Sequence, residues 1–203
     1  MQFTKRMQAM RINEIFYSLQ GEGLFSGTPC VFVRFAGCNL KCEFCDTSHK
    51  NFTNYTCEEL VREVEKYPTK HVVLTGGEPT LQITEELMLA LIDRGIIVHV
   101  ETNGTRENAA LNYAHFVTCS PKFEFCHNAD VVLDNIDELK VVFNGFNDMD
   151  LYKGIEAKHY YLQPCDVGNA EKNKAILDAA IAYCLEHPKW SLSLQTQKIL
   201  NVR

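Results

Sequence analysis

Short apolar runs recur along this chain, separated by stretches whose polar and apolar positions follow a helical pattern. The runs are rich in Val, Ile, Phe and Tyr, and continuous apolar runs of this kind are typical of strands buried on both faces of a parallel sheet. We expect strands at residues 30–36, 71–74, 96–101, 116–119, 139–143, 160–163 and 191–194.

Helix-start residues precede three of the intervening stretches. Thr56, with Glu59 three residues later, matches a capping box, and Thr84 and Asn169 also suit the N-cap position. A proline or glycine follows each stretch as a stop signal. The expected helices run from Thr56 towards Tyr67, over residues 85–94, and from Asn169 to Cys184.

The alternation of strands and helices implies parallel strands joined by right-handed crossovers. A closed eightfold barrel needs about 250 residues, whereas this chain has 203. The sequence therefore predicts an α/β fold with one domain over residues 1–203, in which parallel strands form a partial, incomplete TIM-like barrel.

Polar segments of unusual composition follow several of the expected strands. They are residues 75–79 (TGGEP), 101–104 (ETNG), 120–122 (SPK) and 163–164 (QP). In folds of this kind, ligands bind at the carboxyl ends of the strands. This clustering is the first indication of an enzyme.

The charge balance limits the classes of partner. Lys and Arg total 20 against 26 Asp and Glu, which gives a formal net charge of -6. Proteins that grip phosphate backbones carry clustered positive charge, so we expect no direct contact with nucleic acid. No apolar run is long enough to span a bilayer, and the first ten residues lack the apolar stretch of a signal peptide. We therefore expect a cytoplasmic protein without membrane attachment, with Met1 and Met10 as candidate starts.

The nine cysteines, an odd number without an export signal, do not suggest a disulfide framework. Cys38, Cys42 and Cys45 have the spacing C-x3-C-x2-C directly after an expected strand. Thiolates suit iron–sulfur clusters or zinc. A cubane cluster normally takes four thiolates, so three would leave one iron open to another ligand. A structural zinc site completed by Cys30 or His49 is the alternative.

The cysteine spacing resembles the signature of the radical S-adenosylmethionine superfamily. This resemblance implies that Cys38, Cys42 and Cys45 hold a [4Fe-4S] cluster whose open iron binds S-adenosylmethionine. Phe44 matches an aromatic position near the adenine in that superfamily. Residues 75–79 resemble its GGEP motif, in which adjacent glycines such as Gly77 let the backbone approach the cofactor.

The rest of the chain is similar to the 7-carboxy-7-deazaguanine synthase family. The segments that carry this resemblance are residues 18–23, 33–40, 45–47, 117–122, 162–164 and 193–201. It implies conversion of 6-carboxy-5,6,7,8-tetrahydropterin to 7-carboxy-7-deazaguanine and ammonia, on the route to queuosine in transfer RNA. It also implies Mg²⁺ as a further cofactor, flavodoxin or ferredoxin as electron donor, and a homodimer.

The same resemblance assigns roles to individual residues, with a substrate-binding segment at residues 11–29 and a core at residues 30–203. The implied substrate ligands are Leu19, Gln20, Gly21, Arg34, Thr75 and Arg203, and the Mg²⁺ ligand is Thr47. The implied S-adenosylmethionine ligands are Phe44, Gly77, Ser120, Pro121, Lys122, Gln163, Pro164, Cys165 and Asp166. The planar fork of Arg34 suits a carboxylate, and the amide of Gln20 suits a pterin edge. Glu101 and Asn103 are further candidates for the cofactor, and Gln197 stands where relatives often carry histidine.

The sequence alone is also compatible with other classes of protein. A glycyl-radical-enzyme activase also carries C-x3-C-x2-C on a small chain, but it needs a groove for a protein loop. A zinc-binding interaction module would hold zinc and catalyse nothing. A radical enzyme that acts directly on transfer RNA fits poorly with the acidic balance. Residues 18–23 and Arg34 favour the pterin enzyme.

Overall fold

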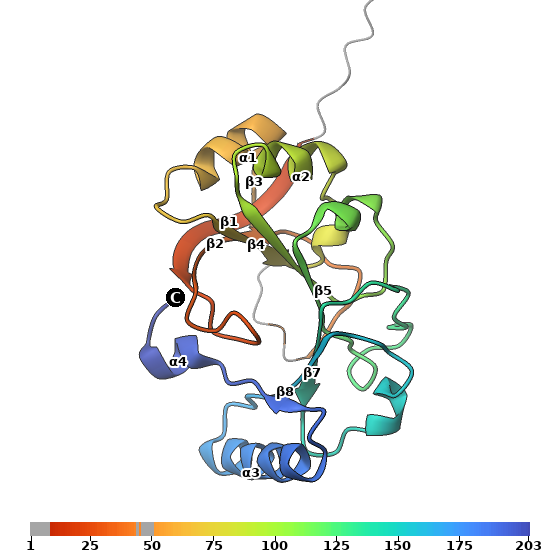
Figure 1. Ribbon diagram of the computed structural model, residues 1–203. Coiled ribbons are helices and arrows are strands. Elements are labelled where there is room, and N and C mark those ends of the chain that lie inside the picture. Colours follow the sequence, from red (N-terminus) through yellow and green to blue (C-terminus); the bar gives the residue numbers. More distant parts are fainter. Residues whose placement is uncertain (1–8, 44, 46–50) are drawn as a thin grey trace, which may run out of the picture.

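A nine-stranded sheet organises the molecule, which we describe from a computed structural model at residues 9–43, 45 and 51–203. The strand order is β3-β1-β2-β4-β5-β6-β7-β8-β9, and the sheet curls without closing (Figure 1). The strands are β1 Met10–Leu19, β2 Pro29–Phe35, β3 Thr53–Tyr55, β4 His71–Gly76, β5 Ile97–Thr102, β6 Phe116–Cys119, β7 Glu138–Phe143, β8 His159–Pro164 and β9 Ser191–Leu192.

From β2 to β9 every neighbouring pair in the described sheet is parallel. The expected fold class, a partial TIM-like barrel, is therefore confirmed. Two antiparallel strands extend the sheet beyond β2: β1 pairs with β2, and β3 pairs with β1. The apolar runs did not predict them, because most positions of β1 are half-buried or exposed and β3 is short and mostly exposed.

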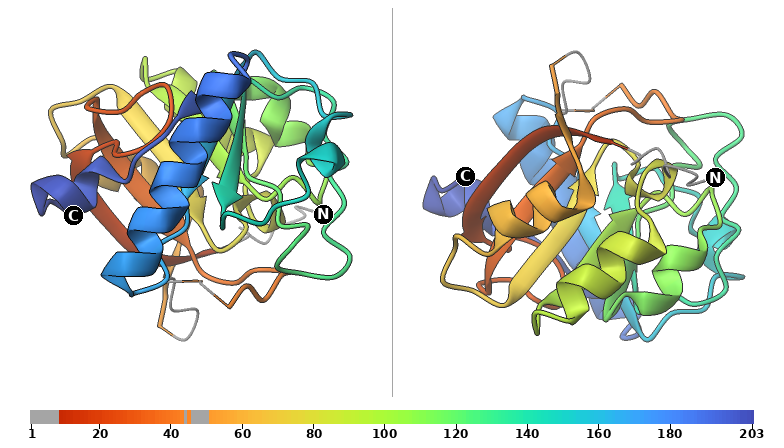
Figure 2. Two further views of the ribbon diagram at one scale, coloured as in Figure 1. Left: turned by 90° about the horizontal axis from the view of Figure 1, so that it is seen from below. Right: turned by 90° about the horizontal axis from the view of Figure 1, so that it is seen from above.

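The helices cover the outer face of the sheet, with α1 and α2 over one half and α3 over the other (Figure 2). Thr56 forms the complete capping box with Glu59, as expected, and Thr84 and Asn169 cap α2 and α3. The first two helices end two to three residues earlier than predicted, at short C-terminal turns. The bounds are α1 Cys57–Val64, α2 Glu85–Ile92, α3 Ala170–Glu186 and α4 Thr196–Leu200.

Two separate apolar cores lie between the sheet and these helices. One joins β2, β4 and β5 to α1 and α2 and contains Leu60, Leu74 and Leu87. The other joins β7 and β8 to α3 through Leu139 and Leu162. Because the outward-facing side chains make these cores, the inward-facing side chains of the same strands are left to form the barrel interior.

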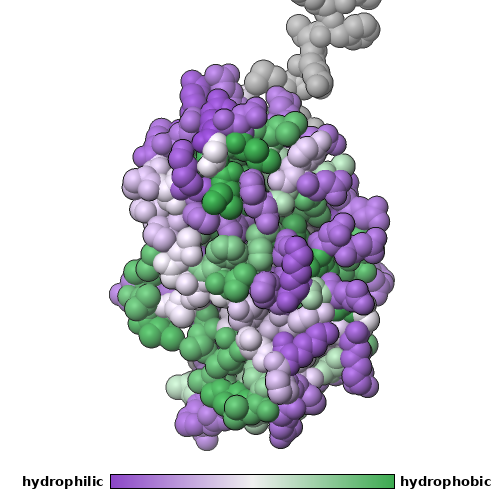
Figure 3. Space-filling view, in the orientation of Figure 1, coloured by the Kyte–Doolittle hydropathy of each residue, from purple (hydrophilic) through white to green (hydrophobic). Residues whose placement is uncertain are grey.

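The described part of the chain contains no helix with the length and apolar character needed to cross a bilayer. Apolar side chains do gather on the surface over α3 and α4, at the lower left of the view in Figure 3. Leu185 of α3 and Ile199 and Leu200 of α4 are among the most exposed large apolar residues. An exposed patch of this kind marks a candidate contact surface.

A histidine pair lies inside the barrel beneath the strand ends. His71 Nδ1 lies 2.9 Å from His99 Nε2, and the ring of Phe25 packs edge-on against His99 at 4.5 Å between centroids. Burial, reinforced by the nearby His71 and His115, lowers the pKa of His99 to about 4. His99 is therefore neutral in the folded protein near pH 7.

This low pKa predicts how the stability of the fold depends on pH. Below about pH 6.5 His99 becomes protonated in the unfolded chain but stays neutral in the folded chain. The free energy of unfolding therefore falls as the pH drops towards about 4. Between about pH 7.5 and about pH 5 we expect a loss of about 2 kcal/mol. Urea unfolding of the unmodified protein and of His99→Leu measures this, and the variant should lose less. Equal losses in the two proteins would refute the assignment.

Candidate active site

A cavity of about 570 Å³ opens at the carboxyl ends of the parallel strands. Inward-facing residues of β2, β4, β5, β6, β7 and β8 line it, together with the cysteine loop, the segment after β1 and the C-terminal tail. The predicted site residues that line it are Leu19, Gln20, Gly21, Arg34, Cys38, Cys42, Cys45, Thr75, Gly77, Ser120, Lys122, Gln163, Pro164, Cys165, Asp166 and Arg203. Pro121 stands between two lining residues, and Phe44 and Thr47 lie outside the described residues.

The glycine-rich segment after β4 ties the cysteine loop to the strand ends. Gly76 has a φ of 114°, and a Cβ there would lie 2.3 Å from the backbone nitrogen of Phe35, so only glycine fits. The Gly77 amide donates to Phe35 O, and the Glu78 amide donates to Gly37 O, both at 2.9 Å. The motif therefore holds the start of the cysteine loop against β4.

Glu78, which sequence reasoning left without a role, is a buried structural acceptor. Its carboxylate accepts hydrogen bonds from Thr80 N and Thr80 Oγ1 at 2.9 and 2.6 Å. It also accepts from Thr102 Oγ1 and Asn103 N, both at 2.8 Å. A buried carboxylate with four donors is well satisfied. Glu78 thus links the ends of β4 and β5 beneath the cavity.

The cysteine loop presents sulfur atoms to the cavity. Cys38 Sγ accepts from Leu40 N at 3.4 Å, and Asn103 Nδ2 lies 3.9 Å away. Cys42 Sγ lies 3.5 Å from the sulfur of Cys126, which comes from the loop after β6. Burial, followed by the contact with Cys126, raises the pKa of Cys42 to about 12.

The side chains of the cysteine loop are of the donor type that an iron–sulfur cluster needs. Cys38, Cys42 and Cys45 all line one cavity, and thiolates are the donors that iron–sulfur clusters require. Among the described residues, no three His, Cys, Asp or Glu side chains are already gathered closely enough to hold a metal ion. The donor set fits a cluster.

The segment after β6 and the segment after β8 face the cavity from the other side. Lys122 Nζ donates to Ser120 O at 2.5 Å and to Ser120 Oγ at 2.6 Å. Burial lowers the pKa of Lys122. Asp166 is held by Lys198 Nζ and Asn173 Nδ2, both at 2.7 Å. These hydrogen bonds, led by that of Lys198, lower the pKa of Asp166. Because Lys198 belongs to α4, its ion pair with Asp166 also anchors the C-terminal tail.

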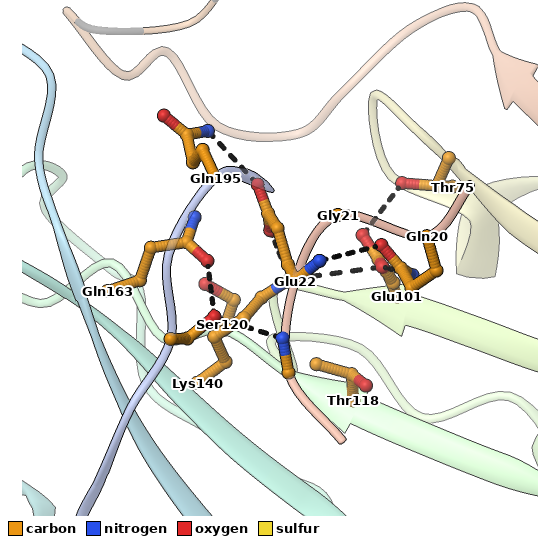
Figure 4. A network of polar contacts seen from close by, with 12 residues as sticks. Gln20, Gly21, Glu22, Thr75, Glu101, Thr118, Ser120, Lys140, Gln163 and Gln195 are labelled. Atoms are coloured by element: carbon orange, nitrogen blue, oxygen red, sulfur yellow. Dashed lines mark hydrogen bonds and ion pairs between the residues drawn. The ribbon is translucent and has the colours of Figure 1, made fainter. Parts of the chain in front are cut away.

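The residues predicted to bind substrate meet at the opposite wall. Gln20 Nε2 donates to Glu101 Oε1 at 2.9 Å, and Thr75 Oγ1 donates to Glu101 Oε2 at 3.3 Å (Figure 4). Arg34 Nε donates to Glu14 Oε1 at 2.8 Å. Arg203 pairs with the same Glu14 carboxylate, which places this tail residue at the cavity wall.

The C-terminal tail lies directly on the substrate segment, which the sequence did not reveal. Gly21 O accepts from Thr196 N at 3.0 Å and from Thr196 Oγ1 at 2.9 Å. Glu22 Oε1 accepts from Gln195 Nε2 at 3.0 Å and from Gln197 Nε2 at 3.3 Å. Gln197 therefore has a definite partner in this chain.

Sequence reasoning also missed a lysine inside the barrel. Lys140 belongs to β7, within an expected apolar strand, and its Nζ lies 2.5 Å from Glu22 Oε2. A charged residue at an inward position of an apolar strand is a signal that could have identified it, because such residues are almost never buried unless they are paired.

An open α/β barrel with the C-x3-C-x2-C cysteines at its strand ends is the architecture of a radical S-adenosylmethionine enzyme. A family model described as the Radical SAM superfamily matches residues 32–118. The 7-carboxy-7-deazaguanine synthase of Bacteroides thetaiotaomicron is 46% identical over 95% of this chain and 98% of that protein. The same enzyme of Haemophilus influenzae is 35% identical over 94% of this chain and 93% of that protein.

The crystal structure of QueE from Escherichia coli has a TM-score of 0.74 and 26% identity, and the match covers 92% of this chain and 93% of that one. This chain belongs to the 7-carboxy-7-deazaguanine synthase family. It is therefore an enzyme of the radical S-adenosylmethionine class, with a [4Fe-4S] cluster and S-adenosylmethionine as cofactors. Membership of this family excludes the two alternatives, the glycyl-radical-enzyme activase and the zinc-binding interaction module.

Proposed function

We propose that the cavity binds 6-carboxy-5,6,7,8-tetrahydropterin and that the enzyme contracts its ring to 7-carboxy-7-deazaguanine with release of ammonia. The observation that carries the proposal is that the cysteine loop and the substrate residues line one cavity. Arg34 supplies a cation for the substrate carboxylate. Gln20 and Glu101, whose Nε2 and Oε1 atoms lie 2.9 Å apart, supply donors and acceptors for the pterin edge.

The cofactors provide the difficult step. When bound, they supply one-electron chemistry that can break an unactivated C–H bond, which no acidic or basic side chain achieves. Cys38, Cys42 and Cys45 are proposed to hold the cluster. The proposed S-adenosylmethionine ligands are Phe44, Gly77, Ser120, Pro121, Lys122, Gln163, Pro164, Cys165 and Asp166.

The chain itself positions the substrate and keeps water away. Leu19, Gln20 and Gly21 form one wall, and Thr75 lies beside them through its bond to Glu101. The tail closes over this wall through Thr196 and reaches the cavity again at Arg203. Holding a substrate in one orientation in a shielded pocket is how a protein directs a reactive cofactor.

The direct test is anaerobic incubation of the enzyme with S-adenosylmethionine, a reductant and 6-carboxy-5,6,7,8-tetrahydropterin, followed by mass spectrometry. We expect 7-carboxy-7-deazaguanine and one ammonia for each substrate consumed. A protein that carries its cluster and cleaves S-adenosylmethionine, yet leaves the carboxypterin unchanged, would refute the proposed substrate.

Magnesium is proposed as a third cofactor, with Thr47 as its protein ligand. Mg²⁺ keeps most of its waters and takes oxygen ligands, so one hydroxyl and the substrate carboxylate would suffice. Omission of Mg²⁺ should slow the unmodified enzyme, and Thr47→Ala should weaken its response to added Mg²⁺. A titration of turnover against Mg²⁺ measures both. An unmodified enzyme whose rate never responds to Mg²⁺ would contradict the assignment.

The remaining partners are also proposals. A flavodoxin or ferredoxin would deliver the electron, and cysteine-rich chemistry of this kind suits the reducing cytoplasm. The exposed apolar residues of α3 and α4 offer a surface for the proposed homodimer. The chain is proposed to act as one domain over residues 1–203, without direct binding of nucleic acid or membrane.

A further inference from the structure

A buried ammonium group lies at the centre of the substrate wall. Lys140 projects from β7 into the barrel, and its side chain is only 6% exposed. Its Nζ lies 2.5 Å from Glu22 Oε2 and 3.8 Å from Glu101 Oε1. Figure 4 shows Lys140 between these two carboxylates. A buried ion pair is rarely a net gain in stability over an apolar core, which points to a role in function.

Lys140 connects three segments that are far apart in the sequence. Glu22 belongs to the substrate segment after β1, and Glu101 lies at the end of β5. Glu22 in turn accepts from Gln195 and Gln197 of the tail through its other oxygen, Oε1. One ammonium group therefore fixes the substrate segment against the barrel wall and, through Glu22, fixes the tail as well.

Glu22 is an anion in this arrangement. Burial alone would raise its pKa, but the charge and hydrogen bond of Lys140, with the bonds from the tail, lower the pKa to about 2. The Lys140 ammonium is correspondingly held in its charged form. Burial lowers its pKa, but Glu101, Glu22 and Glu138 together raise it by more.

The wall holds more carboxylates than Lys140 can neutralise. Glu138, on the same strand, accepts from Leu24 N at 2.8 Å and from Thr118 Oγ1 at 3.3 Å. Burial raises the pKa of Glu138 and the nearby Lys140 opposes this shift. Three carboxylates thus lie near one ammonium, and two of them, Glu22 and Glu101, line the cavity. The wall therefore suits a ligand that brings N–H donors.

The oxygens of Glu101 keep acceptor capacity towards the cavity. A carboxylate offers about four acceptor positions. Glu101 uses Oε1 for Gln20 and Oε2 for Thr75, with Lys140 at the longer 3.8 Å. The orientation of Glu101 is therefore set by its neighbours, while both oxygens remain able to accept from a ligand in the cavity.

We propose that Lys140 is a positioning residue that, through Glu22 and Glu101, makes the enzyme specific for a ring with an aminopyrimidinone edge. This edge presents a ring N–H beside an exocyclic amino group, and both donate towards the carboxylates. An analogue with an oxygen in place of the amino group presents an acceptor to an acceptor, which is repulsive. The proposal rests on the proposed function, since it deepens the recognition of the pterin.

The test compares two ligands that differ in that one group. 6-Carboxypterin carries the amino group, and 6-carboxylumazine carries an oxygen in its place. Binding of each to the anaerobic holoenzyme with S-adenosylmethionine is followed by ligand fluorescence. The unmodified enzyme should prefer the pterin by about 100-fold or more, because an unmatched buried polar group is strongly rejected.

Replacement of Lys140 should remove the preference rather than the fold. In Lys140→Met the preference should fall below about tenfold, and Lys140→Arg should restore much of it by keeping the charge. Lys158→Met is the matched control, because Lys158 forms a comparable 2.6 Å ion pair with Asp137 on the surface. The control should keep the full preference, and the iron content of each variant reports whether it has folded.

Glu22→Gln provides a second route if Lys140→Met does not fold. It keeps the shape and removes the charge, so it too should lower the preference. Full preference in either Lys140→Met or Glu22→Gln would overturn the proposal, even if the unmodified enzyme forms 7-carboxy-7-deazaguanine. If the unmodified enzyme neither binds 6-carboxypterin nor forms that product, the proposed function itself fails.

Discussion

Alanine in place of Cys38, Cys42 or Cys45 is expected to leave the enzyme without a stable iron–sulfur cluster. A cluster held by only three thiolates has no ligand to spare, so the loss of one should reduce iron from about four atoms per chain to fewer than about one. Turnover should disappear with the iron. Iron and sulfide analysis after anaerobic reconstitution measures the effect.

The control for this prediction is the neighbouring cysteine. Cys126 Sγ lies 3.5 Å from Cys42 Sγ, so Cys126 is the sulfur best placed to act as a substitute ligand. Cys126→Ala should retain the full complement of iron, as should Cys57→Ala and Cys184→Ala. Loss of iron in Cys126→Ala, together with its retention in Cys42→Ala, would show that the ligand has been assigned to the wrong residue.

Gly21→Ala is expected to weaken substrate binding by disturbing the contact between the substrate segment and the C-terminal tail. A Cβ at Gly21 would lie 1.7 Å from Gln197 Oε1, 2.5 Å from Gln197 Cδ and 3.0 Å from its backbone nitrogen. The added methyl group would displace the Gln197 side chain from its place beside Glu22 and would press on the tail at the Gln197 backbone. Because the tail also holds Glu22, we expect KM for the substrate to rise by about tenfold or more.

Gly154→Ala is the matched control for this change. Apart from Gly154 itself and its two neighbours in the chain, no atom of the described structure lies within 4 Å of a Cβ at this position, so the added methyl group meets open space. Steady-state kinetics with saturating S-adenosylmethionine should show an unchanged KM for Gly154→Ala. A normal KM in Gly21→Ala would mean that the tail does not close on the substrate segment during catalysis.

The parallel part of the fold could be predicted because its strands are buried on both faces. Such strands are continuous apolar runs, and the runs at residues 116–119 and 139–143 correspond to β6 and β7 within one residue. The antiparallel β1 lacks this signal, since only part of its length is buried. Its pairing with β2 depends on tertiary contacts that a local pattern does not contain.

The site could be predicted where a motif has its own chemistry and could not where it depends on distant contacts. The thiols of the cysteine loop and the glycines after β4 were identified from spacing and resemblance. The contact between Glu22 and Gln197 joins residues 175 positions apart, and nothing local reveals it. Lys140 does leave a local signal, a single charge inside an apolar strand, but that signal does not name its partner Glu22, which lies 118 positions away.

The most direct measurement is electron paramagnetic resonance of the anaerobically reconstituted and reduced enzyme, with and without S-adenosylmethionine. We expect a brown protein with about four irons per chain, whose cluster signal changes when S-adenosylmethionine is added because the open iron gains a ligand. A reconstituted protein that stays colourless and free of iron would contradict the cluster assignment. A cluster signal that S-adenosylmethionine leaves unaltered would contradict the open iron.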